Sequence, residues 1–329
     1  MLTRYSGNPI LVADKGSAWR DVKVYNCAIH KDSSNIYQML FRAVGYDWIS
    51  RIGYAESSDG IHFKVDQSAV LKPWYTWEVK GCEDPRIVKI DDNFWVSYTA
   101  FDGKTARAAL TASKDLKQFG ARKLLFRDWR YNARTQFTPD WSKGAAIFSE
   151  KINGRYYMLF GDSHIWNATS TNLIDWVPNI TPVLTGRPGE FDAAYVETGP
   201  PPIKTDYGWL VIYHGIDTYD VSKTYRIGAA LFDKTDPTKV IWRSKQPLLE
   251  PSEPYEKVGF VDVIDGGFDT LKKLTLEDLH ELSKREKLPK AVFCCGAVKE
   301  HDNLIRLYYG AGDTVICTAT VDLQTILSS

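Results

Sequence analysis

Short apolar and aromatic runs separated by polar turns form the main pattern along this chain. The run Ile36–Arg42 is followed, after a short turn, by the run Arg51–Ser57, and both have the length and residue types of β-strands. The polar turn that follows is closed by an aromatic residue, in Gly60–Phe63. The pattern therefore predicts a chain built from β-hairpins.

This hairpin pattern occurs five times, and its first strands begin at Ile36, Phe94, Tyr156, Trp209 and Ile305. The first four recur at roughly 50 to 60 residues, the period of a propeller blade with its connections. The repeats predict an all-β fold, a five-bladed β-propeller that forms one domain over residues 1–329. A β-sandwich of five unrelated hairpins is the alternative. In a propeller, polar groups at the ends of the inner strands converge on a central channel.

One segment departs from the repeat. Residues 262–290 precede the last hairpin, and Thr275–Glu286 within them has the apolar stripe and first-turn capping pattern of a helix. We expect a short helical insertion that packs on the side of the propeller. A lid over the channel, or a contact between copies in a homo-oligomer, is the alternative role.

Charge balance limits the classes of partner. The 329 residues contain 41 Lys and Arg and 41 Asp and Glu, so no net charge attracts nucleic acid or a membrane surface. A small neutral or locally charged ligand is expected instead. Aromatic residues make up 13% of the chain, which suits a protein that offers flat faces to sugar rings, although aromatic β cores have the same composition.

The start of the chain has no apolar leader, and no stretch is long enough to span a bilayer. We therefore expect a soluble, cytoplasmic protein. The five cysteines lack the spacing of a metal site and are odd in number, which favours free thiols. Adjacent Cys294 and Cys295 have the surroundings of buried strand residues.

The stretch Lys80–Ile87 holds the strongest chemical signal. Glu83 and Asp84 are adjacent carboxylates, and Pro85 after them fixes a rigid turn just before an apolar strand. Asp84 would then be held in place at the edge of a site. An ordinary turn, in which Asp84 accepts local backbone hydrogen bonds, is the alternative.

Several short motifs, in this order and spacing, resemble glycoside hydrolase family 130. This family comprises mannoside phosphorylases and β-mannosidases, five-bladed propellers that cleave β-mannosides with inversion. The resemblance covers nearly the whole chain except roughly residues 262–290. The motifs are Gly7–Ile10, Tyr25–Ala28, Phe41–Gly45, Gly81–Arg86, Ser149–Gly154, Gly199–Ile203, Ile212–Gly215 and Tyr308–Asp313.

The resemblance implies that Asp84 is the general acid that protonates the glycosidic oxygen. It also implies that Asn26, Arg42 and Asp313 hold the mannose that is transferred, and Arg86 and Tyr213 in the matching motifs are added as substrate-binding candidates. These residue types suit the task, since a carboxylic acid can serve an inverting reaction and charged groups bond sugar hydroxyls. Structural pairing of Arg42 and a simple turn at Asp313 remain the alternatives.

The attacking group is either water or phosphate. At four points where the phosphorylases place basic residues, this chain has Lys143, Gly161, Tyr195 and His214, so two cations are missing. Glu197 stands nearby, where it would repel phosphate but could take a proton from water. We therefore predict an inverting glycosidase that cleaves β-mannosides, with β-1,2-linked manno-oligosaccharides as the expected substrate and Glu197 as general base.

Two features favour the alternative, a β-mannoside phosphorylase that produces mannose 1-phosphate. His214 is retained, and Phe293–Val298 resembles the phosphorylase form of that strand. Inorganic phosphate would then be a co-substrate. Neither reaction needs a metal or another cofactor. A sugar-binding propeller without catalysis is a third hypothesis, which would not require both Asp84 and Glu197.

Overall fold

The fold is mostly β-structure with very little helix. The computed structural model describes residues 2–132, 140–218, 224–257, 290–301 and 303–328, and the predicted helical insertion lies almost wholly outside them. Within the described residues, no helix is long and apolar enough to cross a membrane. All five cysteines are buried and unpaired, and Cys294 and Cys295 lie within a strand, as predicted.

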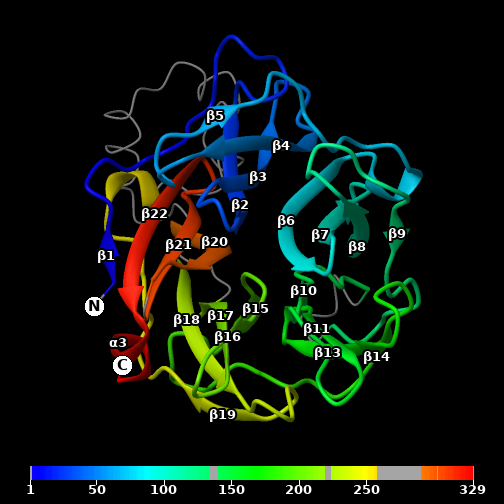
Figure 1. The fold of residues 1–329 in the computed structure, drawn as a ribbon, viewed down its shortest axis with the longest axis vertical. Coiled ribbons are helices and arrows are strands. Elements are labelled where there is room, and N and C mark those ends of the chain that lie inside the picture. Colours follow the sequence, from blue (N-terminus) through cyan, green and yellow to red (C-terminus); the bar gives the residue numbers. More distant parts are fainter. Residues whose placement is uncertain (1, 133–139, 219–223, 258–289, 302, 329) are drawn as a thin grey trace.

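The strands of the described residues fall into five successive groups, which follow one another around the molecule in Figure 1. The first group is β2 (Lys23–Lys31), β3 (Tyr37–Val44), β4 (Ser50–Ser57) and β5 (Lys64–Val65). The second is β6 (Gly81–Ile90), β7 (Asn93–Phe101), β8 (Ala106–Ser113) and β9 (Lys123–Leu124). The third is β10 (Ala146–Ile147), β11 (Tyr156–Phe160), β13 (Trp166–Ser170) and β14 (Val177–Pro178).

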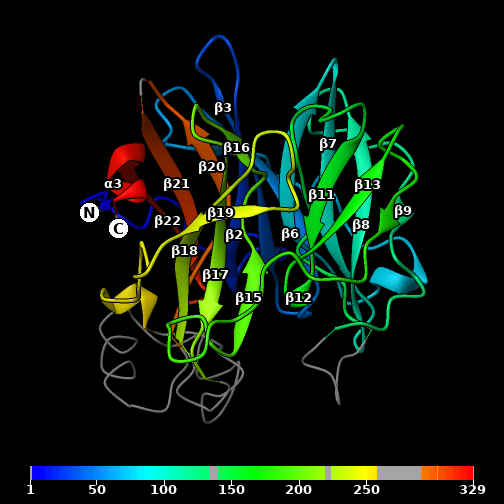
Figure 2. The same ribbon diagram turned by 90° about the horizontal axis from the view of Figure 1, so that it is seen from below.

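The fourth group is β15 (Tyr195–Thr198), β16 (Ile203–Lys204), β17 (Trp209–Ile216), β18 (Thr224–Phe232) and β19 (Val240–Arg243), and β12 (Asp162–Ser163) pairs with β15. The fifth is β20 (Lys290–Lys299), β21 (Leu304–Ala311) and β22 (Val315–Asp322), with β1 (Thr3–Arg4) added at its edge. Because Thr3 pairs with Thr320, the two ends of the chain share one sheet. Figure 2 shows both termini on the same side, beside helix α3 (Leu323–Leu327).

Neighbouring strands inside each group are antiparallel, and short parallel pairings connect some groups. Ser50 pairs with Gly81 between the first two groups, and Thr224 pairs with Lys290 between the last two. Over the part of the chain that the structure describes, hydrogen bonding therefore gives three sheets, of eight, four and ten strands.

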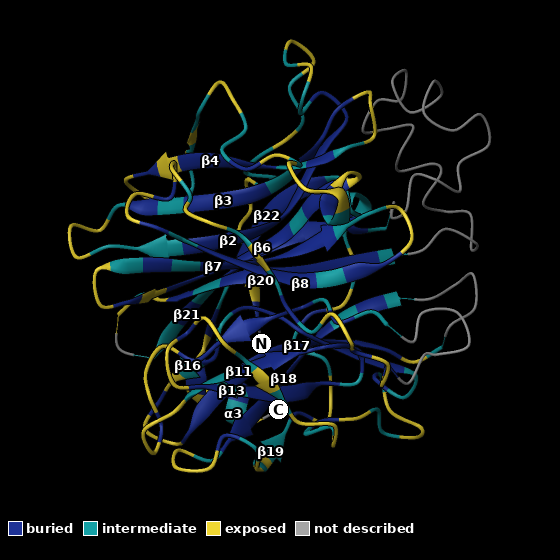
Figure 3. Cartoon of the chain, turned by 90° about the vertical axis from the view of Figure 1, so that its right-hand side faces the viewer, coloured by how far each residue is buried: buried dark blue, intermediate teal, exposed yellow. Residues whose placement is uncertain are grey.

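Among the described residues, six apolar clusters lie between neighbouring groups, two of them between the fourth and fifth groups. Each is formed by two groups, and one joins the fifth group to the first, with Val298 and Ile316 packed against Val24 and Met39. Alternate residues of a strand supply two different clusters, as expected when both faces of a sheet are covered. Buried residues accordingly fill the strands in Figure 3, while exposed residues gather in the connecting loops.

A hydrogen-bonded turn repeats in the first three groups. In each, a serine hydroxyl accepts the backbone N–H two and three residues later, and an Asp or Asn side chain at the middle position accepts the next backbone N–H groups. The residue after that side chain has positive φ. The three turns are Ser57–Gly60, Ser113–Leu116 and Ser170–Leu173. They are the polar turns that the sequence pattern predicted.

A buried carboxylate cluster repeats in the second, fourth and fifth groups. In each, the carboxylate accepts hydrogen bonds from a tyrosine hydroxyl on β7, β17 or β21 and from an arginine. Glu78 and Glu256 lie in the short 3₁₀ helices η1 (Thr76–Glu78) and η2 (Pro254–Glu256). The clusters are Glu78 with Tyr98 and Arg122, Asp192 with Tyr213 and Arg243, and Glu256 with Tyr309 and Arg4.

Candidate active site

The site begins at bulges in the strands nearest the centre. Strand β2 pairs with β3, β6 with β7 and β20 with β21, and each pairing shifts register at one extra residue. The extra residues are Asn26, Asp84 and Cys295. Asn26 and Asp84 have φ of +45° and +48°, which asparagine and aspartate tolerate better than most residues. The buried Asn26 Nδ2 donates to Asp84 Oδ1 at 2.9 Å. The two bulges therefore bring residues 58 positions apart into direct contact.

Arg42 binds both adjacent carboxylates. Its Nη1 lies 3.1 Å from Asp84 Oδ1, and its Nη2 lies 2.7 Å from Glu83 Oε1. Ser50 Oγ accepts from Arg42 Nε at 3.0 Å and donates to Glu83 Oε1 at 2.9 Å. The guanidinium also lies over the ring of Tyr25, 4.6 Å from its centroid. Asn26 and Arg42 thus both hold Oδ1 of Asp84.

The two carboxylates have different electrostatics. Burial raises the pKa of Glu83, and the charge of Asp84 adds to this effect, while Arg42 opposes it. Burial also acts to raise the pKa of Asp84, but the charges of Arg42 and Lys143 and the hydrogen bond from Asn26 outweigh it, so its pKa is lowered. As the pH falls, Glu83 therefore takes up a proton before Asp84 does.

Arg86 connects two distant strands instead of facing an open pocket. Its Nε, Nη1 and Nη2 donate to the backbone carbonyls of Gly199, Asp84 and Thr198 at 2.7, 3.0 and 2.7 Å, and the residue is 1% exposed. These contacts engage three nitrogen atoms of the guanidinium. Arg86 fixes the bulge at Asp84 against the end of β15, and this geometry does not support the predicted contact with substrate.

A second charged group lies at β15. Lys143 Nζ is 2.7 Å from Glu197 Oε2 and 3.3 Å from the Tyr195 hydroxyl, and Asp162 Oδ1 is 3.9 Å away. The Tyr195 hydroxyl also donates to Glu197 Oε2. Glu197 and Asp162 stand opposite each other in the pairing of β12 with β15. Lys143 is therefore the charge partner of two buried carboxylates.

Burial dominates the electrostatics of this second group. It raises the pKa of Glu197, although the charge of Lys143 acts in the other direction. For Lys143, burial disfavours the ammonium, but the charges of Glu197 and Asp162 overcome this and raise its pKa. Lys143 is thus charged at neutral pH.

His214 stands opposite Glu197 in the pairing of β15 with β17. Its Nε2 accepts the backbone N–H of Cys294 at 2.8 Å, and its ring stacks on Phe293 with centroids 3.7 Å apart. Burial and the positive charges of Arg86 and Lys143 lower its pKa well below the usual value. The ring is therefore neutral, its proton is on Nδ1, and among the described residues that buried nitrogen has no hydrogen-bond partner.

Of the two remaining predicted residues, Asp313 lies near the site and Tyr213 lies away from it. Asp313 lies in the turn between β21 and β22 with φ of +51°, close enough to Tyr25 to affect that hydroxyl's pKa. Tyr213 does not join the site. Its hydroxyl donates to Asp192 Oδ2 at 2.6 Å and accepts from Arg243 Nε at 3.0 Å, on the face of β17 opposite His214. The geometry thus assigns Tyr213 to a core cluster and corrects its predicted place at the substrate.

Three further polar residues belong to the site by their contacts: Glu83, Ser50 and Asp162. The sequence shows Glu83 as the neighbour of Asp84, but it does not show that both carboxylates bind Arg42. Nothing in the sequence around Ser50 marks it, because its role depends on the pairing of Ser50 with Gly81 across two groups. Asp162 becomes recognisable only once β12 is seen to pair with β15.

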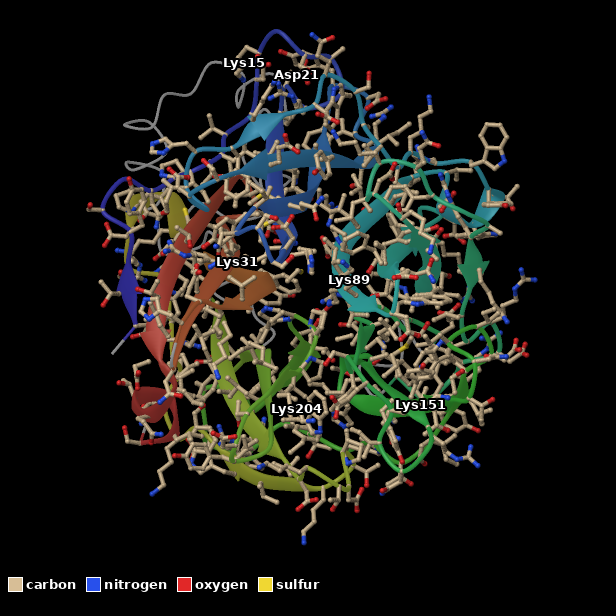
Figure 4. All side chains as sticks on the ribbon, viewed as in Figure 1. Lys15, Asp21, Lys31, Lys89, Lys151 and Lys204 are labelled. Atoms are coloured by element: carbon tan, nitrogen blue, oxygen red, sulfur yellow. The ribbon has the colours of Figure 1, made fainter. Side chains whose placement is uncertain are left out.

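Cavities open at both ends of the inner strands. A cavity of about 360 Å³ is lined by Arg42 and Glu83 together with Lys23 at the start of β2. Another, of about 470 Å³, is lined by Lys31 and Lys89 at the opposite ends of β2 and β6. Figure 4 is seen from this second end, where both lysines lie near the centre. The carboxylates and Arg42 therefore belong to the first end.

The arrangement offers a proton donor and a separate polar region for an attacking group. Asp84 comes from the second group of strands, and Glu197 comes from the fourth, with Lys143 between the second and third. The described residues include no cluster of three His, Cys, Asp or Glu side chains suited to a metal ion. Acid catalysis with attack from another side is the chemistry that these groups can perform.

Comparison with known proteins identifies relatives along the whole chain. The model of glycoside hydrolase family 130, described as beta-1,4-mannooligosaccharide phosphorylase, matches residues 2–266. A 1,2-beta-oligomannan phosphorylase from Thermoanaerobacter sp. (strain X514) is 36% identical over 337 residues, covering 99% of this chain and 98% of the relative. A beta-1,2-mannobiose phosphorylase from the same organism is 33% identical, with 99% and 98% covered.

Solved structures of proteins from the same family have a similar fold. The beta-1,2-mannobiose phosphorylase from Listeria innocua, in complex with beta-1,2-mannobiose, has a TM-score of 0.77 and 27% identity, covering 99% of this chain and 98% of that one. Another structure, with a TM-score of 0.79 and 26% identity over 98% and 94% of the chains, is described with glycoside hydrolases of the same family that target beta-1,2 mannosidic linkages in Candida mannan.

Proposed function

The chain belongs to glycoside hydrolase family 130, and on that premise we propose that it cleaves β-1,2-linked manno-oligosaccharides with inversion, by transfer of mannose to inorganic phosphate. It is an enzyme of the mannoside phosphorylase and glycosidase type, so the hypothesis of a non-catalytic sugar-binding module is set aside. The β-1,2 linkage and the phosphate acceptor are carried over from its relatives.

Asp84 is proposed as the general acid, and the observation that carries this assignment is its fixed position. Asn26 and Arg42 both hold Oδ1, which leaves Oδ2 as the oxygen able to carry a proton toward the glycosidic oxygen. Arg42, Asn26 and Asp313 are the proposed contacts of the transferred mannose. A bound sugar that displaced Arg42 from Asp84 would raise the pKa of Asp84 and favour the acid form.

The acceptor of the mannose differs between the sequence prediction and the relatives. The sequence predicted water, whereas the relatives are phosphorylases and support phosphate. In the proposed reaction, phosphate lies beside Lys143 and takes a hydrogen bond from His214 Nδ1–H. The unpartnered Nδ1 supports this arrangement, because a buried donor without a partner is costly unless a ligand satisfies it. Phosphate then attacks carbon 1 of the mannose while Asp84 protonates the leaving oxygen.

Hydrolysis is the second candidate, and one specific observation favours it. The four carboxylates Asp84, Glu83, Glu197 and Asp162 outnumber the three cations Arg42, Arg86 and Lys143 by one charge when all are ionised. A phosphate with −1 to −2 charges would be repelled by the surplus. Glu197 would then act as the base that takes a proton from water, as the sequence predicted.

The fold is proposed to be a single-domain, five-bladed β-propeller. Five strand groups, apolar packing between every pair of neighbouring groups, and the pairing of β1 with β22 all support closure of the ring. Cytoplasmic location and a homo-oligomer through residues 262–290 remain predictions.

Incubation with β-1,2-mannobiose, with and without phosphate, tests the reaction. We expect mannose and mannose 1-phosphate only when phosphate is present, and no turnover by Asp84→Asn. Two molecules of free mannose without phosphate would establish hydrolysis instead. No cleavage under either condition would refute the assigned substrate.

A further inference from the structure

The cavity of about 470 Å³ lies at the end of the inner strands opposite the proposed acid. Its lining comes from all five strand groups, with Ser149 from the third and Pro202 from the fourth. Lys89 in this lining follows Asp84 on the same strand, β6, by five positions. At about 3.3 Å per residue, a ligand beside Lys89 lies roughly 15 Å from the proposed acid. The cavity is therefore separate from the proposed active site.

Among the described residues, a lysine and an aromatic ring form the same pair at this end of four strand groups. The lysine comes five or six positions before an aromatic residue at the start of β3, β7, β11 or β17. Its Nζ lies 5.0 to 6.0 Å from the centroid of that ring, a cation–π contact that holds the lysine in place. The pairs are Lys31 with Tyr37, Lys89 with Phe94, Lys151 with Tyr156, and Lys204 with Trp209.

The fifth group completes a ring of lysines around this end. Lys299 has the matching place at the end of β20, although Leu304 begins β21 where the other groups have an aromatic residue. In Figure 4, Lys31 and Lys89 lie near the centre. These two and Lys299 line the cavity. The lysine ring consists of Lys31, Lys89, Lys151, Lys204 and Lys299.

Both carboxylates in the cavity lining already have partners. Glu300 Oε2 accepts from Lys31 Nζ, and its Oε1 accepts from Arg306 Nε, both at 2.6 Å. Two cations therefore share this one carboxylate. Asp32 Oδ1 accepts two backbone N–H groups of its own turn, at 2.8 and 2.9 Å. The carboxylates are thus bound by the protein itself.

Positive charge is in excess around the cavity. Lys89 and Lys299 are exposed, and within the described part of the chain neither forms an ion pair. Four cations, the three lining lysines and Arg306, stand against two carboxylates. Burial and the charge of Lys89 lower the pKa of His30, which also lines the cavity, so its ring adds no charge at neutral pH. A phosphate monoester, which carries about −1.5 to −2 charges, matches this excess.

The rest of the lining suits a sugar. Ser33, Asn35 and Ser149 offer hydroxyl and amide groups, while Ile87 and Pro202 add apolar surface. A sugar needs both, because it presents hydroxyls and apolar C–H faces. The cavity has the volume of a small-molecule site, which favours a small ligand over an extended polyanion such as DNA. The balanced charge of the whole chain also disfavours nucleic acid.

We propose that this cavity binds a small sugar phosphate. Lys31, Lys89 and Lys299 bind the phosphate group, and the serine and asparagine side chains of the lining bind the sugar hydroxyls. Lys151 and Lys204, farther out, attract the anion toward the cavity through their field. This second binding site does not depend on whether water or phosphate attacks the mannoside.

Calorimetry with mannose 6-phosphate, and with mannose as the uncharged comparison, tests the proposal in about 0.15 M salt. Lys89→Met keeps a side chain that packs on Phe94 and removes only the charge. It should weaken binding of mannose 6-phosphate about tenfold and leave mannose binding unchanged. Lys151→Met is the matched control, because Lys151 forms the same pair with Tyr156 but does not line the cavity. It should change the affinity less than about twofold.

Three results would overturn the proposal. The first is an absence of saturable mannose 6-phosphate binding to the wild-type protein. The second is an affinity that remains unchanged both in Lys89→Met and in the double variant with Lys299→Met, whose side chains are exposed and whose melting temperatures should not change. The third is binding of a DNA duplex that Lys89→Met and Lys151→Met weaken equally, which would assign the lysine ring to nucleic acid.

Inorganic phosphate is the probe that separates the anion from the sugar. We expect Lys89→Met to weaken mannose 6-phosphate binding more than phosphate binding, because the ester also gains contacts with the polar lining. If the wild-type protein bound both equally tightly, and Lys89→Met weakened both equally, the cavity would recognise the anion alone and the assignment of a sugar would be wrong.

Discussion

Replacing Glu83 by glutamine is predicted to change the pH dependence of the enzyme without removing its acid. The glutamine side chain keeps an oxygen that can accept from Arg42 and Ser50, so the hydrogen bonds at 2.7 and 2.9 Å can persist. Only the negative charge is lost. Because that charge opposes ionisation of Asp84, its removal lowers the pKa of Asp84 further.

The size of the effect follows from the shared arginine. Carboxylates bound to two nitrogens of one guanidinium lie about 5 Å apart, and at an effective dielectric constant of about 20 they repel by roughly 3 kcal/mol. That corresponds to roughly 2 pKa units as an upper limit, since the Glu83 side chain is 13% exposed to screening water. A decrease of about one unit or more is expected for Asp84.

The assay is kcat/KM for mannobiose cleavage across pH. In the proposed mechanism Asp84 acts in its acid form, so activity should decrease as the pH rises through its pKa. A lower pKa of Asp84 should move this decrease to lower pH. At neutral pH, Glu83→Gln should therefore lose about tenfold or more in kcat/KM, and the difference should narrow in acid. Ser50→Ala, which changes no charge, is the control. An unchanged profile, or a decrease that moves to higher pH, would refute the reasoning.

Two further predictions concern buried charges. Glu197→Gln removes one negative charge near Lys143. If the enzyme uses phosphate, the KM for phosphate should therefore fall about tenfold. If turnover without phosphate instead falls about 100-fold or more, Glu197 is the base that takes a proton from water. Asp192→Asn leaves Arg187 and Arg243, which lie 2.8 and 2.7 Å from Asp192, without a counter-charge, and should lower the free energy of unfolding by about 3 kcal/mol in urea titration. The control is Asp175→Asn, which removes the exposed ion pair of Asp175 with Lys123 and should leave the urea midpoint unchanged. If Asp192→Asn were as stable as the wild-type protein, the cluster around Asp192 would not support the fold.

The sequence predicted the hairpins well, because their signals are local. The aromatic-closed turns at Ser57–Gly60 and Ser113–Leu116 have hydrogen-bonding residues within four positions of one another, so spacing alone reveals them. The apolar alternation of strands such as β21 is equally local. The mostly β fold follows from these elements.

The site was only partly predictable, since its contacts join residues far apart in the chain. Asp84 and Asn26 could be selected by motif, but their hydrogen bond spans 58 positions. Tyr213 shows the limit of a motif, because neighbouring strand residues face opposite sides of the sheet. Tyr213 is one position before His214, so its hydroxyl lies in a core cluster with Asp192 instead of at the site.

The repeated bulge gives this fold a way to change its chemistry one residue at a time. An extra residue at the bulge of β2, β6 or β20 lies outside the inward and outward alternation, so its side chain can be exchanged without moving the strand that follows. Two of these positions carry asparagine and aspartate, and the third carries Cys295. Related enzymes could therefore diverge in the group they present at residue 295 while the surrounding packing stays intact.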